Sequence, residues 1–312
     1  MQKPRFPFLK IKHYCLAAFS LVLTFFILTR PSECLAYALS GLQLWFNRMV
    51  PTLFPFMVLS GMMVRLRLTD TFVSLLKPVL SPLFQVSPTC IYGMVIGFLC
   101  GFPMGAHTAA QLYESGQISK AEASFLLSFC NNIGPVYFLS FVLSTLKLSH
   151  PAYFLLGMYG LPFLYGLLLR YTLYRKKLSP KGLPRSAASP PSLLSALDES
   201  VFSSLNGIAR LGGYMIFFNL LFILPDLMFQ SSFFRGLISC LLEITGGIGL
   251  IQDHAPILVL CILPFGGLSC IAQTYSMIKS TDLSITEYVM HKMILTAVTV
   301  CYYTLSAGKY FG

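Results

Sequence analysis

The stretch GFLCGFPMGAHTAAQLYESGQISKAEASFLLSFCNNIGP, from Gly97 to Pro135, decides how this chain folds. Two helix-breaking clusters interrupt its apolar run, Gly101 to Gly105 and Asn131 to Pro135, and a polar turn from Glu114 to Lys120 separates them. A break leaves backbone N–H and C=O groups without helical partners, which lipid tolerates only where they are buried in protein or line a wet cavity. The stretch therefore indicates either a site at membrane depth or two kinked helices without a ligand.

The composition around this stretch is that of a membrane protein. Of the 312 residues, 55% are hydrophobic and only 11% are charged, with a mean hydropathy of +0.72. Soluble domains carry about 25% charged residues. We therefore expect an all-α polytopic membrane protein embedded in a lipid bilayer.

The charge is distributed as membrane topology requires. The net charge is +11, and the basic residues gather in two places: the N-terminus (Lys3, Arg5, Lys10, Lys12) and one loop (Arg170, Arg175, Lys176, Lys177, Lys181, Arg185). Cytoplasmic flanks of membrane helices carry such clusters under the positive-inside rule. No nucleic-acid-binding motif accompanies them, so the sequence favours topology over nucleic acid as their explanation.

The sequence offers no motif for catalysis, a metal or a cofactor. Its nine cysteines form no CxxC pair and no zinc-like spacing with histidine. HExxH, GxSxG and P-loop patterns are absent as well. We expect neither an enzyme nor a bound metal or cofactor.

The chain divides into four regions by composition. Residues 1–49 hold a first membrane helix, from His13 to Thr29, and an interfacial helix from Glu33 to Met49 with Trp45 as anchor. Residues 50–174 form a first repeat, in which the segment from Phe72 to Phe84 is too broken by proline to span. Residues 175–192 are an exposed basic linker, rich in proline and serine, on the cytoplasmic side. Residues 193–312 form a second repeat.

The second repeat begins with a segment predicted to lie at the surface, from Leu193 to Asn206. Four apolar segments follow: Gly207 to Leu224, Phe233 to Ile251, Pro256 to Ile278 and Tyr288 to Ser306. The first three contain glycine pairs, so we expect discontinuous or re-entrant helices in this half too.

A shift of 165 positions aligns features of the two halves. Gly101 falls on Gly266, and the capping pattern Ser119-x-x-Glu122 falls on Ser284-x-x-Glu287. Paired interrupted segments in two halves of a chain point to the binding site of a secondary transporter. Helix N-termini at such breaks suit an anionic or polar solute.

Polar residues inside the apolar runs are the candidate site. Glu243 is the most informative, since a carboxylate at membrane depth is costly and usually functional. It would bind solute or carry a coupling proton; alternatively it pairs with Arg235 or with a backbone donor. His107 is expected to be a packing residue. The candidate solute-binding set is Gly101, Gly105, Asn131, Asn132, Glu243, Thr245, Gly266, Gly267, Ser269 and Gln273, with helix–helix bonding as the alternative for the amides and hydroxyls.

Three motifs carry a resemblance to a known family: GFPMGA (101–106), GQISKAEA (116–123) and LLSFCNNIGP (126–135). With EITGG (243–247) and FGGLSCIAQT (265–274), they resemble the YlbJ family of sporulation integral membrane proteins, which carries the nucleoside-recognition (Gate) domain. The resemblance runs from about Val50 onward. It implies two Gate-like repeats and a role in spore formation.

The resemblance also implies an activity: transport of a small polar or anionic solute, with dipicolinic acid as the expected cargo. The implied location is the bacterial cell membrane, with the outer forespore membrane as one place for it, and a homo-oligomer is compatible with it. Glu243 would repel a dianion unless protonated, which leaves a nucleoside open as cargo. A non-transporting scaffold for spore assembly remains the alternative of another class.

Overall fold

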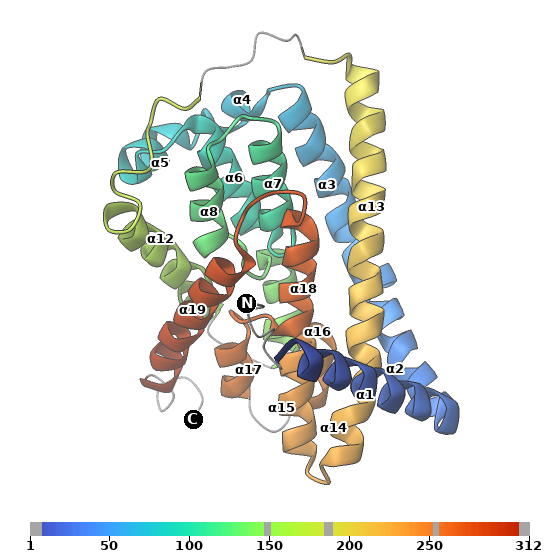
Figure 1. The fold of residues 1–312 in the computed structure, drawn as a ribbon. Helices are drawn as coiled ribbons and strands as arrows, with labels where there is room; N and C mark the ends of the chain where they lie inside the picture. Colours follow the sequence, from blue (N-terminus) through green and yellow to red (C-terminus); the bar gives the residue numbers. More distant parts are fainter. Residues whose placement is uncertain (1–7, 147–150, 184–189, 252–255, 306–312) are drawn as a thin grey trace, which may run out of the picture.

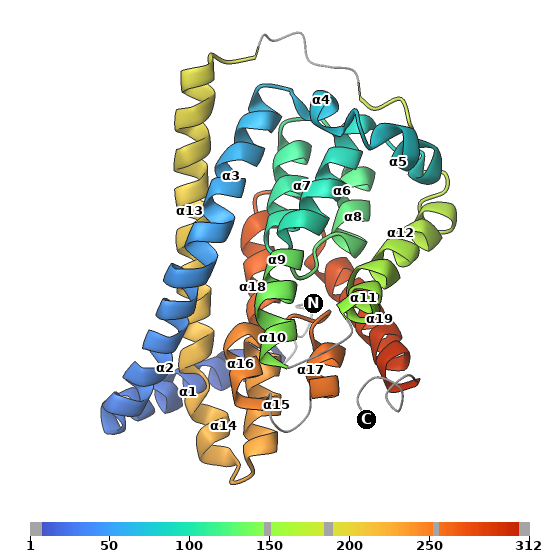
Figure 2. The ribbon, with the colours of Figure 1, turned by 180° about the vertical axis from the view of Figure 1, so that it is seen from behind.

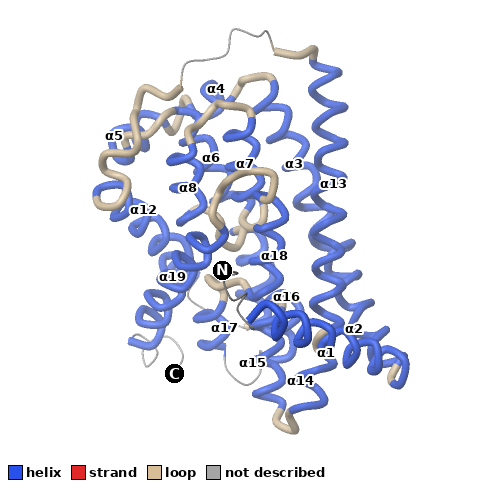
Figure 3. The backbone as a smooth tube through the Cα atoms, viewed as in Figure 1, coloured by secondary structure: helices blue, strands red, loops and turns tan. Residues whose placement is uncertain are grey.

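A computed structural model of the chain describes residues 8–146, 151–183, 190–251 and 256–305. Every regular element within these ranges is a helix, and loops connect them (Figure 3). The all-α prediction is therefore confirmed for the described part. Lys3 and Arg5 of the basic start lie outside it, as do residues 184–189 of the predicted linker.

Two long helices form the spine of the fold (Figure 1). The first runs through α2 (Pro31–Leu44), η1 (Trp45–Met49) and α3 (Val50–Arg65), and the second is α13 (Leu193–Leu220). The two approach closely because Gly212 leaves room for the Trp45 ring. Trp45 Nε1 also donates to the Ile208 carbonyl at 2.8 Å. Trp45 thus joins the two helices, where the sequence predicted an interfacial anchor.

The spine corrects two predicted boundaries. The boundary at residues 49 and 50 falls inside a helical run, since η1 continues directly into α3. The surface segment predicted over Leu193 to Asn206 is the first half of the unbroken α13. A single Gly207 costs such a helix only about 1 kcal/mol, and packing against α2 and α3 offsets that cost.

The first helix is strongly inclined to the helix that follows it. α1 (Phe8–Thr29) meets the α2–α3 helix at 106° and crosses the lower end of α13 (Figure 1). Arg30 leaves helical geometry with φ −130°, and Pro31 begins α2. The residue before a proline disfavours helical backbone, so the chain turns there. The predicted spanning helix from His13 to Thr29 is therefore one arm of a bent pair.

The first half then folds around the opening stretch. Its helices are α4 (Thr69–Val73), α5 (Lys77–Phe84), α6 (Pro88–Cys100), α7 (Met104–Glu114), α8 (Lys120–Phe129), α9 (Pro135–Tyr137), η2 (Phe138–Val142), α10 (Leu143–Thr145), α11 (Pro151–Leu155), η3 (Leu156–Gly160) and α12 (Leu161–Tyr171). α6 and α7 pack on each other as a hairpin in the upper half of the molecule. α8 descends beside them, and after its break the chain continues downward through α9 and α10 (Figure 2).

The predicted capping box at the start of α8 is confirmed. Ser119 Oγ accepts from the Glu122 amide, and the Glu122 carboxylate accepts from the Ser119 amide at 3.0 Å. The other oxygen of Glu122 accepts from the Ser87 amide at 3.2 Å. Ser87 caps α6, so one carboxylate fixes the starts of two neighbouring helices.

The second half also contains a helical hairpin and a broken helix pair, in the opposite orientation. After α13 come α14 (Ile223–Met228), α15 (Ser232–Leu242), α16 (Ile244–Ile251), α17 (Pro256–Ile262), α18 (Gly267–Ile278) and α19 (Ile285–Leu305). α15 and α16 pack as a hairpin in the lower half, whereas α17 and α18 follow each other upward through a break. The two hairpins thus come from opposite ends of the molecule, which is the geometry of an inverted repeat.

This geometry changes the register that the sequence suggested. The break at Gly101 forms a hairpin tip, and its structural counterpart is the tip at Glu243. The break at Gly266 lies inside a span, like the break at residues 130–134. The shift of 165 instead pairs two turns at the same end, α7 to α8 and α18 to α19, which touch through Tyr113 and Asp282.

Within the described residues, three segments are long and apolar enough to cross a membrane: Pro151–Tyr171, Leu193–Met228 and Pro256–Ile278. Two bent pairs raise the number to five if each is one span. The short α5, predicted to be too broken to span, belongs to one of these pairs and meets α6 at 104°.

Candidate functional site

The breaks of both halves meet in the middle of the molecule, and within the first half Gly101 packs tightly against the α8–α9 break. Its φ is +77°, and a Cβ there would lie 2.8 Å from the Asn132 carbonyl oxygen. The next amide, of Phe102, donates to that same oxygen at 2.5 Å. Gly105 packs against Asn131 in the same way. The tip of the α6–α7 hairpin therefore packs directly against the α8–α9 break. This contact brings the candidate residues of the first half together.

Asn131 connects this seat to the second half. Its Oδ1 accepts from the Ala106 amide at 3.2 Å, near the start of α7. Its Nδ2 donates to Thr274 Oγ1 at 3.0 Å on α18 and to Tyr288 Oη at 3.1 Å on α19. All of these groups are buried. The side chain is thus engaged in helix–helix bonding, the alternative that the sequence left open.

Asn132 lies beside a buried lysine. Lys292 Nζ, on α19, donates to Asn132 Oδ1 at 3.0 Å and also to the Asn131 carbonyl. The Lys292 side chain is only 2% exposed. Among the described residues, none places a carboxylate within ion-pairing distance of it. Lys292 Nζ also lies 5.6 Å from the centre of the Tyr288 ring. A basic side chain whose contacts are neutral at this depth is a candidate functional residue.

Glu243 forms the tip of the second hairpin and caps α16. Its carboxylate accepts from the Gly246 amide at 2.7 Å and the Thr245 amide at 3.1 Å, as well as from the Thr245 hydroxyl. Asn219 Nδ2 on α13 adds a bond at 3.2 Å. Arg235 pairs instead with Asp226 at 2.7 Å. Of the two structural partners considered for Glu243, the backbone donors are therefore present and the arginine is not.

The α17–α18 break completes the centre. Gly267 has φ +80°, and a Cβ there would lie 3.0 Å from the Cys240 carbonyl at the end of α15. Gly266 sits near the Phe102 ring of the first hairpin. Ser269 Oγ accepts from Gln273 Nε2 at 2.8 Å, so these two candidates bond to each other on α18.

The structure thus brings the predicted residues into two adjoining groups. Gly101, Gly105, Asn131 and Asn132 lie on the Lys292 side, while Glu243 and Thr245 lie at the opposite hairpin tip. Gly266 and Gly267 are at the α17–α18 break beside that tip, and Ser269 and Gln273 follow on α18. His107 lies apart, because its ring lines a separate cavity toward the linker end.

Four buried residues of this centre were not predicted: Asn219, Thr274, Tyr288 and Lys292. Lys292 could have been found, because a lysine inside the apolar segment from Tyr288 to Ser306 is a functional signal of the same kind as Glu243. The other three are polar residues of ordinary membrane helices, and nothing in their spacing marks them.

No cluster of three or more histidine, cysteine or acidic side chains is placed to hold a metal ion in the described part of the chain. All nine cysteines are free, and seven of them are buried.

Comparisons with known proteins agree with this architecture. Residues 46–149 match the model of a family named Gate and described as nucleoside recognition. This region holds the α6–α7 hairpin and the α8–α9 break. The chain is also 26% identical to the sporulation integral membrane protein YlbJ of Bacillus subtilis over 327 aligned positions, which cover 91% of this chain and 80% of that protein.

No solved structure matches the chain significantly. The relative's description and the apolar helices agree that this is an integral membrane protein. The resemblance found in the sequence is thereby confirmed: residues 46–149 match the nucleoside-recognition Gate model, and the chain is similar along nearly its whole length to YlbJ.

Proposed function

We propose that this protein is not an enzyme but a transporter that moves a small polar or anionic solute across a bacterial membrane during spore formation. Dipicolinic acid is the first candidate for the cargo, and the outer forespore membrane is the proposed place. The name of the relative supports the link to sporulation. Two hairpins that enter from opposite ends and meet at a central set of breaks support the link to transport.

The observation that carries the proposal is Lys292. A buried cation without an acidic partner is costly, and an anion bound next to it would offset that cost. The ammonium lies where the break of α8–α9 meets α19. A carboxylate of the solute could replace one of the two neutral oxygens that now accept from it.

Glu243 does not oppose an anionic cargo in this arrangement. Its carboxylate is directed onto the N-terminus of α16 and accepts from two amides, one hydroxyl and one side-chain amide. These donors and the helix dipole neutralise much of its charge. Four helices begin at the breaks: α7, α9, α16 and α18. A side chain of the protein accepts from an amide at the start of two of them, Asn131 at α7 and Glu243 at α16.

The test is flux into liposomes that contain the purified protein, with labelled dipicolinate and uridine as separate cargoes. We expect dipicolinate to move down its gradient and Lys292→Met to slow it at least tenfold, the loss expected for one charged interaction. Lys279→Met is the matched control, since Lys279 is exposed at the end of α18.

The outcomes separate the alternatives. Flux of uridine but not dipicolinate would favour the nucleoside cargo that the family description names. If folded protein moves neither solute, and cells carrying Lys292→Met form spores normally at unchanged protein level, the transport proposal fails and the scaffold alternative stands.

A further inference from the structure

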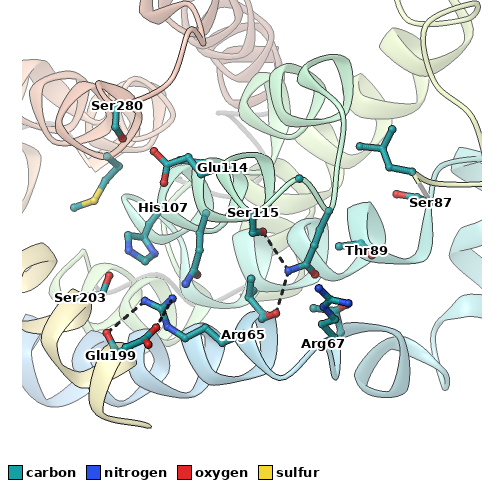
Figure 4. Close-up of a pocket in the computed structure, with 18 of the residues that line it drawn as sticks. Arg65, Arg67, Ser87, Thr89, His107, Glu114, Ser115, Glu199, Ser203 and Ser280 are labelled. Carbon is teal, nitrogen blue, oxygen red and sulfur yellow. Dashed lines mark hydrogen bonds and ion pairs between the residues drawn. The ribbon is translucent and has the colours of Figure 1, made fainter. Parts of the chain in front are cut away.

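A cavity lies between the central breaks and the basic linker. It has a volume of about 1150 Å³ and is bounded by α3, α7, α13 and α18, with linker residues 180–183 along its rim (Figure 4). Four basic and three acidic side chains line it: Arg65, Arg67, Lys181, Arg210, Asp70, Glu114 and Glu199. Because the signs nearly balance, this cavity would select a solute by hydrogen bonding more than by charge.

Three residues that line this cavity each have a buried polar atom without a hydrogen-bond partner: Arg65 Nε, His107 Nδ1 and Gln111 Oε1. Ser200 Oγ, beside Gln111, is a fourth such atom. Buried polar atoms are rarely left unpaired, and each one costs about 1–3 kcal/mol. The four come from three different helices, so no single local distortion accounts for them. They therefore point to a common ligand.

The four atoms belong to α3, α7 and α13, on one side of the cavity. His107 and Gln111 lie one turn apart on α7, and both residues line the cavity. Ser200 is next to Gln111, since a Cβ on Gly61 would lie 3.0 Å from Ser200 Oγ and 3.6 Å from Gln111 Nε2. Arg65 is held by Glu199, with Nη1 3.5 Å from Oε2, and this leaves its Nε–H available.

We propose that this cavity is a second solute site, which binds a small molecule through a carboxylate or carbonyl oxygen. Arg65 donates to that oxygen through Nε–H, His107 donates through Nδ1–H, and the Gln111 amide donates or accepts, with the Ser200 hydroxyl beside it. Ordinary ligand pockets measure about 300–1,000 Å³, so the cavity holds such a solute together with water.

The position of the cavity gives the site a role that rests on the proposed transport. His107 follows directly on the turn of α7 that contacts Asn131. Ser276 and Met277 line the cavity on α18, while Thr274 of the same turn bonds Asn131. A solute that moves between the linker end and Lys292 would therefore pass this site, which shares its α7 and α18 walls with the centre.

The experiment is equilibrium binding to the purified full-length protein in detergent, with dipicolinate and uridine as probes. Gln111→Leu and His107→Leu each remove an unpartnered polar atom, so both variants should fold at least as well as wild type. We expect each to weaken binding of the recognised probe about fivefold or more, the effect of one net hydrogen bond. Gln43→Leu is the matched control, because Gln43 is exposed on α2.

Lys292→Met separates this inference from the proposed function. We expect it to reduce flux and to leave binding at the linker-side cavity in place. The second site is supported if Gln111→Leu and His107→Leu lose binding, whether or not the wild type shows flux. A preference for one probe then identifies the solute as an anion or as a neutral carbonyl compound. Wild-type affinity in both variants, or no saturable binding of either probe to wild type, overturns it even if flux is observed.

Discussion

Lys292 Nζ lies 3.0 Å from Asn132 Oδ1, and this bond joins the last helix of the second half to the break in the first. Asn132 is itself fixed, since its Nδ2 donates to the Phe129 carbonyl at 2.5 Å. The ammonium is therefore held at a defined point by a rigid neutral acceptor. A neutral acceptor leaves the positive charge available to a solute, which a carboxylate would not.

Asn132→Asp should convert this bond into an ion pair. Asp has the same shape as Asn but cannot donate to the Phe129 carbonyl, so the gain of a charged partner for Lys292 is offset by that lost bond. The variant should therefore unfold at about the same temperature as wild type. Anion flux should nevertheless fall at least tenfold, since the aspartate competes with the solute for Lys292. Thermal unfolding and dipicolinate flux measured on the same preparation check both parts.

The double variant Asn132→Asp with Lys292→Met serves as the control. It buries an unpaired carboxylate and should be less stable than either single variant by about 3–5 kcal/mol. Flux that is unchanged in Asn132→Asp would mean that the charge of Lys292 does not act on the solute.

Gly101→Ala tests the contact between the first hairpin tip and the α8–α9 break. Gly101 has φ +77°, and an added Cβ would lie 2.7 Å from Gly134 Cα and 2.8 Å from the Asn132 oxygen. Gly116→Ala is the matched control, because its φ is +67° but nothing lies within 4 Å. The control should cost about 1–2 kcal/mol from backbone strain alone.

Gly101→Ala should therefore cost clearly more than Gly116→Ala in the free energy of unfolding, about 3 kcal/mol or more. Chemical unfolding followed by fluorescence measures the difference. Equal costs would show that the hairpin tip is free to move away from the break.

The sequence predicts the first-half breaks well because glycine, proline and asparagine cause them directly. Gly101 requires a backbone that other residues avoid, and Pro135 begins a new helix after Gly134. The turn after α7 is equally local, since Ser119 and Glu122 form the capping box by themselves. Such features depend on residues a few positions apart, which a sequence displays openly.

The second hairpin could not be predicted in the same way. The glycine pair at Gly246 and Gly247 indicates a break in the segment from Phe233 to Ile251. The helix ends earlier, at Leu242, because the Glu243 carboxylate caps the helix that follows it. That cap is also fixed from α13 by Asn219. Interactions between distant segments of this kind set the register of the repeat, and the shift of 165 could not detect them.

The two turns at the linker end are joined by an ion pair whose pH dependence can be measured. Asp282 accepts from Lys120 Nζ at 2.8 Å and from Tyr113 Oη at 2.9 Å. The bond from Lys120, followed by that from Tyr113, holds the pKa of Asp282 below its usual value. A lowered folded-state pKa adds stability above the unfolded-state value of about 3.9 and loses it as the pH falls through the folded-state value.

Asp282→Asn should therefore unfold at a lower temperature than wild type at about pH 7, and the difference should shrink toward zero below roughly pH 4. The difference should also decrease in high salt, because the pair is exposed. A difference independent of both pH and salt would indicate that the contact between the turns does not depend on the charge of Asp282.

Glu243 distinguishes a capping residue from a proton carrier. The Thr245 and Gly246 amides bond to different oxygens of Glu243, and Glu243→Gln keeps one of these acceptors, so α16 should still begin at Ile244. The loss of the charge at the helix start should cost about 1 kcal/mol, and flux should stay within about threefold of wild type. Glu243→Ala leaves those donors and Asn219 without an acceptor and should cost about 3 kcal/mol or more.

Thermal unfolding and flux in liposomes at two internal pH values measure both effects. Glu243 carries a coupling proton if Glu243→Gln is as stable as predicted but transports nothing, and if wild-type flux follows the proton gradient. If the flux of Glu243→Gln persists and does not depend on the gradient, the carboxylate serves to hold the hairpin tip against the centre.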